Sequence, residues 1–299
     1  MKENEFGKKY SEPIVLALGM FDCVHIAHIK LIHETKILAK KFDAQTAVFT
    51  FKNNPTVFYK NKDKLIYNYA DRLYRFAQEK VDVVVYKEVD QEFANICAET
   101  FLDILSRTFN IAAVVCGEDF TFGKNANGNV KLLKCFCNKN NIYLKIIKTL
   151  TAENVKISTS LIKQLIKEGN IEEANKLLGK PYMISGVVIN GDGIGNKFLY
   201  PTANISLDFE KAEIMPGVYE TSTLTDGKLY KSVTSYGAKP TLDKYNRTME
   251  THIIGLSKNL YNKVITVYFV KRLRDIKKFE NVTLLKKQIE EDIKIVEQS

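Results

Sequence analysis

The sequence predicts two domains of different fold class, an α/β domain built on a parallel sheet and a small β-barrel that ends in a helix. In residues 1–180, short apolar runs alternate with amphipathic stretches, and such alternation of strands and helices is typical of a parallel sheet covered on both faces. In residues 181–299 the apolar segments are shorter and separated by turn signals, which is typical of a closed or partly closed barrel. A chain of 299 residues is long enough for two such domains.

The first domain opens with the apolar run at residues 14–20, which has the length and composition of a buried strand. A helix with an apolar face is expected over residues 28–41. In a parallel sheet of this kind, the ligand site lies beyond the carboxyl ends of the strands. The later elements are expected at 46–51 (strand), 70–80 (helix), 81–86 (strand), 92–108 (helix), 112–116 (strand), 129–140 (helix), 143–147 (strand), and 158–169 and 171–178 (helices).

The second domain is predicted from turn signals rather than from long apolar runs. After Gly179 and Pro181 the pattern changes, and strand-like segments follow from Met183 onward. Glycine-containing turns are expected at residues 190–193, 226–227 and around 255, and a last amphipathic helix over 282–297. The boundary between the domains is therefore placed near residue 180.

Composition argues against several classes of protein. No apolar stretch approaches the ~20 residues of a membrane-spanning helix, and the start of the chain lacks the apolar run of a secretory signal. The five cysteines form neither a disulfide framework nor a zinc pattern. We therefore expect a cytoplasmic protein with reduced thiols, monomeric or weakly homo-oligomeric, without a membrane partner.

The net charge of +9 leaves a polyanionic partner open. Most of the basic residues are dispersed lysines, and no recognised nucleic-acid-binding module occurs. A non-enzymatic nucleic-acid-binding protein is kept as an alternative, which predicts lysines clustered on one face and binding that falls steeply with salt. The dispersed pattern favours small-molecule substrates and no nucleic acid.

Histidine gives the sharpest local signal. Three of the four histidines, His25, His28 and His33, fall within nine residues. His25 and His28 lie where a strand end, a tight turn and a helix start are expected, so that imidazoles, backbone N–H groups and the positive end of the helix dipole meet at a place that suits a phosphate. Spacing alone leaves a second reading open, in which the pair caps the helix or binds a metal incidentally.

Residues 19–28 resemble the HxGH signature of the nucleotidylyltransferase superfamily and, in the longer form FDGVHxGH, the N-terminal domain of prokaryotic bifunctional riboflavin kinase/FAD synthetases. The resemblance continues through residues 50–55, 117–128 and 156–163, in the family's order and spacing. Four motifs together are far more specific than any one of them. The resemblance implies a Rossmann-like FMN adenylyltransferase (nucleotidylyltransferase) domain.

The resemblance also assigns ligand-binding residues in the first domain. These residue types fit the chemistry, because aromatic faces hold a flat ring, and hydroxyls and N–H groups at a helix start hold a phosphate. The residues implied for ATP are Gly19, Phe21, Asp22, His25, His28, Ser158, Thr159, Ser160 and Lys163, with His25 and His28 also catalytic. The residues implied for FMN are Phe51, Pro55, Asp119, Phe120, Phe122 and Asn125.

The second domain carries a further set of motifs. Residues 201–204 resemble the family's PTAN motif, in which Thr202 and Asn204 would coordinate Mg²⁺ and the terminal phosphates of ATP. Oxygen ligands are what this hard cation prefers. Glu250 is the implied general base for a primary hydroxyl, a role that a carboxylate can fill. The other residues implied for ATP or flavin binding in this riboflavin kinase domain are Gly186, Gly191, Gly195, Pro201 and Arg274.

The resemblance runs from about residue 14 to residue 295 and implies a transferase with two activities. Riboflavin would be phosphorylated to FMN with ATP in the barrel. FMN would be adenylylated to FAD with a second ATP in the first domain, with release of pyrophosphate. The implied small molecules are ATP, Mg²⁺ and the flavins riboflavin, FMN and FAD.

The chain departs from the family at several motif positions. Cys23 and Ala27 stand where the family has glycine, and a β-carbon costs ~1 kcal/mol or more where a backbone must approach a nucleotide closely. A single-activity riboflavin kinase with a degenerate first domain therefore stays open as an alternative. The remaining departures are Met20, Lys163, Asn196, Leu199, Tyr200, Ser235, Tyr236 and Lys239.

Overall fold

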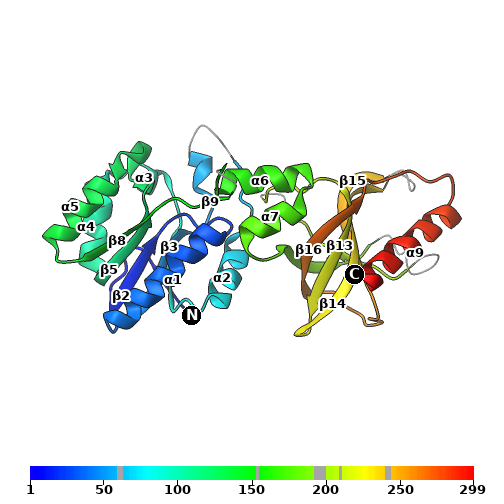
Figure 1. Ribbon diagram of the computed structural model, residues 1–299, viewed down its shortest axis with the longest axis horizontal. Helices are drawn as coiled ribbons and strands as arrows, with labels where there is room; N and C mark the ends of the chain where they lie inside the picture. The colour runs from blue at the N-terminus through cyan, green and yellow to red at the C-terminus, as the bar shows by residue number, and fades with distance from the viewer. Residues whose placement is uncertain (59–62, 153–154, 192–199, 209–210, 240–243) are drawn as a thin grey trace. The chain divides into compact units, whose positions relative to one another are not determined.

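The computed structural model describes residues 1–58, 63–152, 155–191, 200–208, 211–239 and 244–299. They form two compact units, Met1–Thr159 and Ser160–Ser299 (Figure 1). The first unit is α/β and the second contains a closed barrel and a terminal helix, so the predicted fold class is confirmed. The candidate residues Gly195, Asn196 and Leu199 lie outside the described part of the chain.

The first unit is built on a six-stranded sheet whose strands all run parallel, in the order β1-β4-β3-β2-β5-β8. From β2 the chain first adds strands on one side and later, from β5, on the other side. The switch in direction between β2 and β5 marks the expected ligand position. The strand bounds are β1 (Lys2–Glu5), β2 (Tyr10–Leu18), β3 (Gln45–Phe51), β4 (Val83–Lys87), β5 (Phe109–Gly117) and β8 (Tyr143–Ile147).

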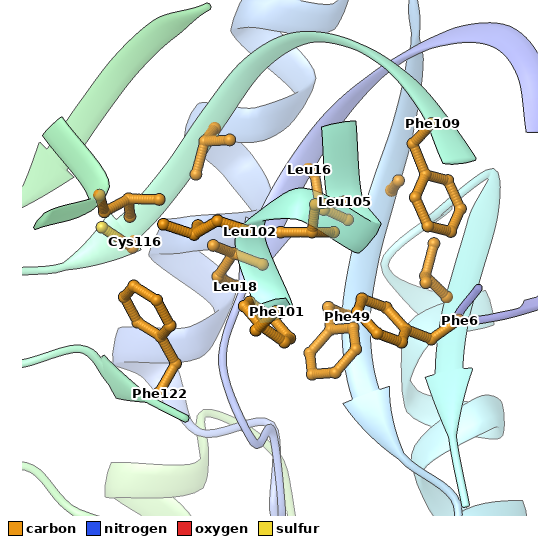
Figure 2. Close-up of a cluster of buried hydrophobic side chains, with 14 of the residues drawn as sticks. Phe6, Leu16, Leu18, Phe49, Phe101, Leu102, Leu105, Phe109, Cys116 and Phe122 are labelled. Carbon is orange, nitrogen blue, oxygen red and sulfur yellow. The ribbon is translucent and has the colours of Figure 1, made fainter. Parts of the chain in front are cut away.

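Helices cover both faces of this sheet, because successive strand residues point to opposite faces and both sets are apolar. Val15 and Ala17 pack with buried residues of α1 (Ile26–Lys41) and α2 (Tyr69–Gln78). Leu16 and Leu18 pack on the other face with α4 (Ala98–Thr108) and α5 (Val130–Lys139), in the aromatic-rich cluster of Figure 2.

The helix expected over residues 92–108 is divided into α3 (Gln91–Ala94) and α4. Cys97 is the N-cap of α4, and its sulfur accepts a hydrogen bond from the N–H of Thr100 at 3.4 Å. A capped start in the middle of the expected helix accounts for the division. Short elements complete the unit: η1 (Pro55–Phe58), β6 (Thr121–Phe122), η2 (Lys124–Ala126), β7 (Gly128–Asn129), β9 (Thr151–Ala152) and β10 (Val155–Lys156).

Two helices precede the barrel, α6 (Thr159–Glu168) and α7 (Ile171–Leu178), and residues from Ser160 onward group with the barrel. The side chain of Asn175 accounts for the attachment of α7. It donates to the carbonyl of Phe269 at 2.8 Å and accepts from the N–H of Tyr182 at 2.7 Å. The structural division therefore lies about one helix pair ahead of the sequence boundary near residue 180.

The barrel closes in the order β11-β12-β15-β14-β13-β16. Hydroxyl-bearing side chains line part of its buried interior, where Thr221 and Thr234 bond at 2.8 Å and Thr234 and Thr251 at 2.9 Å. Helix α9 (Val282–Gln298) packs through Ile293 and Val296 with Val218 and Val233 of the barrel wall. The strands are β11 (Tyr182–Ile189), β12 (Ala203–Ile205), β13 (Gly217–Thr225), β14 (Lys228–Lys239), β15 (Lys244–Ile253) and β16 (Val264–Arg274).

Candidate functional site

A cavity of about 670 Å³ opens in the first unit at the carboxyl ends of β2, β3, β5 and β8, beside the switch between β2 and β5. This is the place that the parallel sheet predicts for a ligand, and the volume suits a small molecule. Most of the residues that the sequence assigns to ATP or FMN in this unit come together there. They are Gly19, His25, His28, Phe51, Pro55, Asp119, Phe120, Phe122, Asn125, Ser158 and Thr159.

His25 and His28 lie side by side at the start of α1. Their rings are stacked, with centroids 3.7 Å apart and planes 10° from parallel. Nδ1 of His25 accepts the N–H of His28 at 3.3 Å, so His25 does cap the helix. With Nδ1 accepting, the proton of neutral His25 is on Nε2, where it is available to a ligand. The capping reading is therefore confirmed, and phosphate binding by the pair stays a prediction.

Burial keeps both imidazoles neutral near pH 7. It lowers the pKa of His25 to about 4, although the charge of Asp119 acts in the opposite direction. Burial, together with the neighbouring His25, holds the pKa of His28 well below its ordinary value. Among the described residues, Nδ1 of His28 is buried without a hydrogen-bond partner. Buried polar atoms without a partner are uncommon in folded proteins.

The turn between β2 and α1 is held by its own buried side chains. Phe21 and Val24 have φ angles of 51° and 48°, in the left-handed region. The ring of Phe21 is fully buried, 4.9 Å from the His28 ring and 5.7 Å from the Phe76 ring, centroid to centroid. A Cβ on Gly19 would lie 3.0 Å from the Phe21 ring. The buried Phe21 ring thus supports the turn from the protein interior. Its predicted contact with ATP stays a prediction.

Asp22 is also directed into the protein. One carboxylate oxygen accepts the N–H groups of Ile66 at 2.9 Å and Tyr67 at 3.2 Å. The side chain is buried, and two backbone donors at one oxygen tie the turn to the segment ahead of α2. Its predicted contact with ATP likewise stays a prediction.

The two positions that depart from the family glycines differ in their surroundings. Cys23 is fully buried, and its sulfur lies 3.9 Å from Oγ1 of Thr159. Burial raises the pKa of the Cys23 thiol, so the group stays protonated. Ala27 lines the cavity. A methyl group therefore reaches the ligand space at Ala27, whereas the Cys23 side chain is packed against the start of α6.

Aromatic rings form the other wall of the cavity. Phe51 lies 6.2 Å from Phe93, and Phe120 stacks on Phe122 with centroids 5.5 Å apart. Phe93, which the sequence analysis did not select, also lines the cavity. Such faces can hold a planar ring system.

The loop that carries Phe120 and Phe122 depends on two glycines. A Cβ on Gly123 would lie 2.7 Å from the backbone of Ala98, and one on Gly128 would lie 2.7 Å from the Phe122 ring. The loop therefore sits too close to α4 and to its own aromatic ring for any larger residue at these positions. Asn125 follows with φ 54°, an angle that asparagine tolerates better than most residues.

The charged side chains that line the cavity are Asp119, Lys148 and Lys156. Asp119 and Lys156 form an ion pair and are both well exposed. Lys156 belongs to a matched motif but was not among the predicted binding residues. Ser160 and Lys163 follow Thr159 in α6 and belong to the second unit. Neither is among the residues that line this cavity, and their predicted contacts with ATP stay predictions.

Arg72 is a supporting residue that sequence reasoning missed. It is almost fully buried and donates from Nη1 to the Thr50 hydroxyl at 2.7 Å, and that hydroxyl donates to the carbonyl of Met20 at 2.7 Å. The chain of bonds holds the turn that precedes His25. An arginine in an amphipathic helix reads as a surface residue, so the sequence carries no signal for this role.

In the barrel, cross-strand pairing brings the predicted kinase residues together. Asn204 of β12 lies directly opposite Glu250 of β15, and Ser235 of β14 lies opposite Glu250 on its other side. Directly opposed residues share a face of the sheet. Asn204, Glu250 and Ser235 therefore form one row across three strands.

Two of the glycines implied for ATP or flavin binding in the barrel make close approaches that explain their identity. A Cβ on Gly191 would lie 2.1 Å from the side-chain amide of Asn204. A Cβ on Gly186 would lie 2.6 Å from both Ile205 and the Ser206 carbonyl. A side chain at Gly186 would displace the short strand that carries Asn204, and one at Gly191 would displace the Asn204 side chain.

Thr202 and Pro201 line a second cavity, of about 450 Å³, together with Thr251 and the segment from Leu256 to Tyr261. Arg274, the predicted phosphate or flavin contact, is engaged elsewhere. Its guanidinium donates from Nε and Nη2 to the buried carboxylate of Asp292 at 2.9 and 2.7 Å. This two-point bond fixes α9 to the barrel, and a ligand contact by Arg274 stays a prediction.

None of the helices among the described residues is both long and apolar enough to cross a membrane.

Comparisons with known proteins find relatives for both units. The FAD synthetase family model matches residues 7–161, and the riboflavin kinase family model matches residues 178–299. The bifunctional riboflavin kinase/FMN adenylyltransferase of Buchnera aphidicola subsp. Schizaphis graminum is 34% identical, over 97% of this chain and 95% of its own. That of Bacillus subtilis is 32% identical, over 93% and 90%.

Among solved structures, a Streptococcus pneumoniae protein described as a macrolide-efflux protein has a TM-score of 0.88 and 26% identity, with full coverage of both chains. Both family models and the near full-length relatives indicate the same family. The chain belongs to the bifunctional riboflavin kinase/FMN adenylyltransferase family.

Proposed function

We propose that this chain makes FAD from riboflavin in two steps, each with its own ATP. The barrel phosphorylates riboflavin to FMN. The α/β unit joins FMN to the adenylyl group of a second ATP and releases pyrophosphate. The observation that carries this proposal is the presence of two separate assemblies, the histidine-lined cavity and the Asn204–Glu250 row.

In the kinase step, Glu250 takes the proton of the primary hydroxyl of riboflavin as the hydroxyl oxygen attacks the γ-phosphorus of ATP. The bond from the γ-phosphorus to the bridging oxygen breaks, and ADP leaves with that electron pair. Phosphoryl transfer depends mainly on positioning and charge stabilisation. The place of Glu250 opposite Asn204 supports this assignment, because the base then lies beside a residue proposed to hold the phosphates.

The donor set fits Mg²⁺ when the cation arrives with ATP. The Thr202 hydroxyl and the Asn204 amide oxygen are hard, neutral ligands. Among the described residues there is no group of three or more His, Cys, Asp or Glu that could hold a metal without phosphate. The Asn204 side chain lies so close to Gly191 that a Cβ there would clash with it. When bound, the cation would neutralise charge on the terminal phosphates.

In the adenylylation step, a phosphate oxygen of FMN attacks the α-phosphorus of ATP, and the bond to the bridging oxygen of pyrophosphate breaks. His25, His28 and the first N–H groups of α1 would donate to the phosphate oxygens as charge builds up there. The Phe51 and Phe120 side of the cavity would hold the flavin ring. Ser158 and Thr159, at the start of α6, would hold the nucleotide phosphates.

We also place the functional boundary near residue 180 and the enzyme in the cytoplasm, as a monomer or weak homo-oligomer that binds neither nucleic acid nor membrane. The match of the riboflavin kinase family model from residue 178 supports the boundary. The five free cysteines, all among the described residues, support a reducing compartment.

The test is incubation with riboflavin, ATP and Mg²⁺, followed by chromatographic separation of the flavins. We expect FMN and FAD, and absence of both would overturn the proposal. The second candidate is a riboflavin kinase alone, favoured by the Ala27 methyl group in the cavity. Supplying FMN and ATP separates the two, since a kinase alone yields no FAD from FMN.

A further inference from the structure

His252 contacts the segment that precedes the short strand β12. Its Nδ1 lies 2.9 Å from the carbonyl oxygen of Pro201. A carbonyl oxygen only accepts hydrogen bonds, so Nδ1 carries the proton and donates. His252 is two residues from Glu250 on β15 and therefore projects from the same face.

The regular pairing at this place is short. β12 is three residues long and pairs with β15 through Ala203 opposite Thr251 and Asn204 opposite Glu250. Thr202 and Pro201 lie ahead of the strand. The His252 side chain thus attaches the chain to β15 beyond the point at which the backbone pairs end.

Tyr200, the residue before Pro201, contacts both His252 and α9. The Tyr200 ring lies edge-on to the His252 ring, with centroids 5.2 Å apart. The Tyr200 hydroxyl donates to a carboxylate oxygen of Glu290 in α9 at 3.3 Å. This hydroxyl bond runs to α9 and involves neither Pro201 nor β15.

We propose that His252 is a positioning residue for riboflavin phosphorylation: its Nδ1–H bond to Pro201 fixes the backbone that carries Thr202 and Asn204 against the strand that carries Glu250. The inference rests on the proposed kinase function of these three residues. It assigns His252 no contact with substrate.

The first test is the tautomer of His252, measured by ¹⁵N NMR on protein labelled at its four histidines. The His252 signal is assigned by its loss in His252→Asn. At a pH where the ring is neutral, we expect the proton on Nδ1. A proton on Nε2 would overturn the proposal, whether or not the protein phosphorylates riboflavin.

The second test compares substitutions that keep or remove the donor. Asparagine places an amide nitrogen where Nδ1 of histidine lies, whereas leucine keeps the bulk without a donor. We expect His252→Leu to raise the KM for ATP in phosphorylation about fivefold, the usual effect of losing one hydrogen bond, with a smaller change in kcat. His252→Asn should stay within about twofold of the original.

Binding of ATP with Mg²⁺ is measured by calorimetry on the Glu250→Gln background and fitted with two sites, because each unit is proposed to bind its own ATP. The affinity of one site should weaken in the same ratio, and that of the other should not change. This readout needs no kinase activity, so failure of the proposed function and failure of the positioning role are separable. Equal effects of asparagine and leucine, in KM and in binding, would overturn the positioning role.

If His252→Leu fails to fold, His252→Gln replaces it, because its amide nitrogen falls at the Nε2 position instead. Asparagine should then outperform glutamine, and equality would contradict the proposal. Tyr200→Phe is the matched control, since it keeps the ring against His252 and removes only the bond to Glu290. We expect its KM for ATP to be unchanged within about twofold.

Discussion

The two units assemble their sites by different physical means. In the α/β unit, segments far apart in sequence meet because parallel strands end at the same edge of the sheet, and the resulting cavity already contains a buried, stacked histidine pair. In the barrel, Asn204 and Glu250 meet because two antiparallel strands are paired at those positions. The first site depends on sheet topology, and the second depends on the register of a three-residue strand.

This difference indicates where each site is vulnerable. Several buried hydrogen bonds stabilise the turn between β2 and α1 that borders the cavity, such as those of Asp22 with Ile66 and of Arg72 with Thr50. The kinase row relies on the close approach of Gly191 and on the attachment of Pro201 to β15. Independent sites should also fail independently, so the sharpest experiments disable one unit and measure the other.

The largest effect is expected from Glu250→Gln. Removing the general base should slow phosphorylation of riboflavin roughly 10³-fold, because the attacking hydroxyl then keeps its proton. Adenylylation of supplied FMN should be retained. Both rates are measured by chromatography of the flavin products. Glu280→Gln, at an exposed carboxylate, is the control, and parallel loss of both activities in a folded Glu250→Gln protein would contradict separate sites.

His28→Ala is the corresponding test for the α/β unit. Loss of an oriented donor at the phosphate should reduce FAD formation from FMN about 10²-fold and leave FMN formation from riboflavin intact. His33→Ala, at an exposed position on the same helix, should change neither rate. Circular dichroism checks that the α/β unit stays folded. FAD formation at the original rate would exclude His28 from the reaction.

The buried histidines also predict a dependence of stability on pH that is specific to the α/β unit. The pKa of His25 is about 4 in the folded protein and about 6.5 when unfolded, so between these values the unfolded chain binds more protons. The free energy of unfolding should therefore fall as pH drops from about 6.5 to 4. Denaturant titrations should show a shallower fall in His25→Gln, and an unchanged slope would contradict a neutral, buried His25.

The smallest effect is expected at Ala27 and Cys23, the two positions where the family has glycine. Ala27→Gly removes a methyl group from the cavity and should lower the KM for ATP in adenylylation by about two- to fivefold. Cys23→Gly should give no such gain, because the thiol is buried outside the ligand space against Thr159. It should instead lower thermal stability. The opposite pattern would show that Cys23 is the residue that restricts the nucleotide.

Much of this architecture could be predicted because it follows from the pattern of apolar residues and from the turn residues. Alternating strands and helices predicted the parallel sheet, and that sheet predicted where His25, Asp119 and Thr159 would meet. Side-chain direction within the turn could not be predicted. Phe21 has a left-handed φ angle, and its ring and the Asp22 carboxylate turn inward, away from the cavity that the motif borders.

Side-chain contacts between residues far apart in the sequence could not be predicted either. The family resemblance implied Arg274 as a ligand contact, and that contact stays a prediction. The bond of Arg274 to Asp292, eighteen residues later on α9, could not be predicted. The attachment of α7 to the barrel involves Asn175, whose side chain bonds to the backbone of β16. Neither contact leaves a local pattern in the sequence, because each is defined only once the barrel has closed.

The most direct measurement of the division between the units is a complementation assay with two inactive variants. Glu250→Gln and His28→Ala are each incubated with riboflavin, ATP and Mg²⁺, singly and mixed, and FAD is measured over time. Neither variant alone should make FAD at a substantial rate, whereas the mixture should, because FMN released by His28→Ala is adenylylated by Glu250→Gln. A folded mixture that makes no FAD, while the original protein does, would contradict two independent sites.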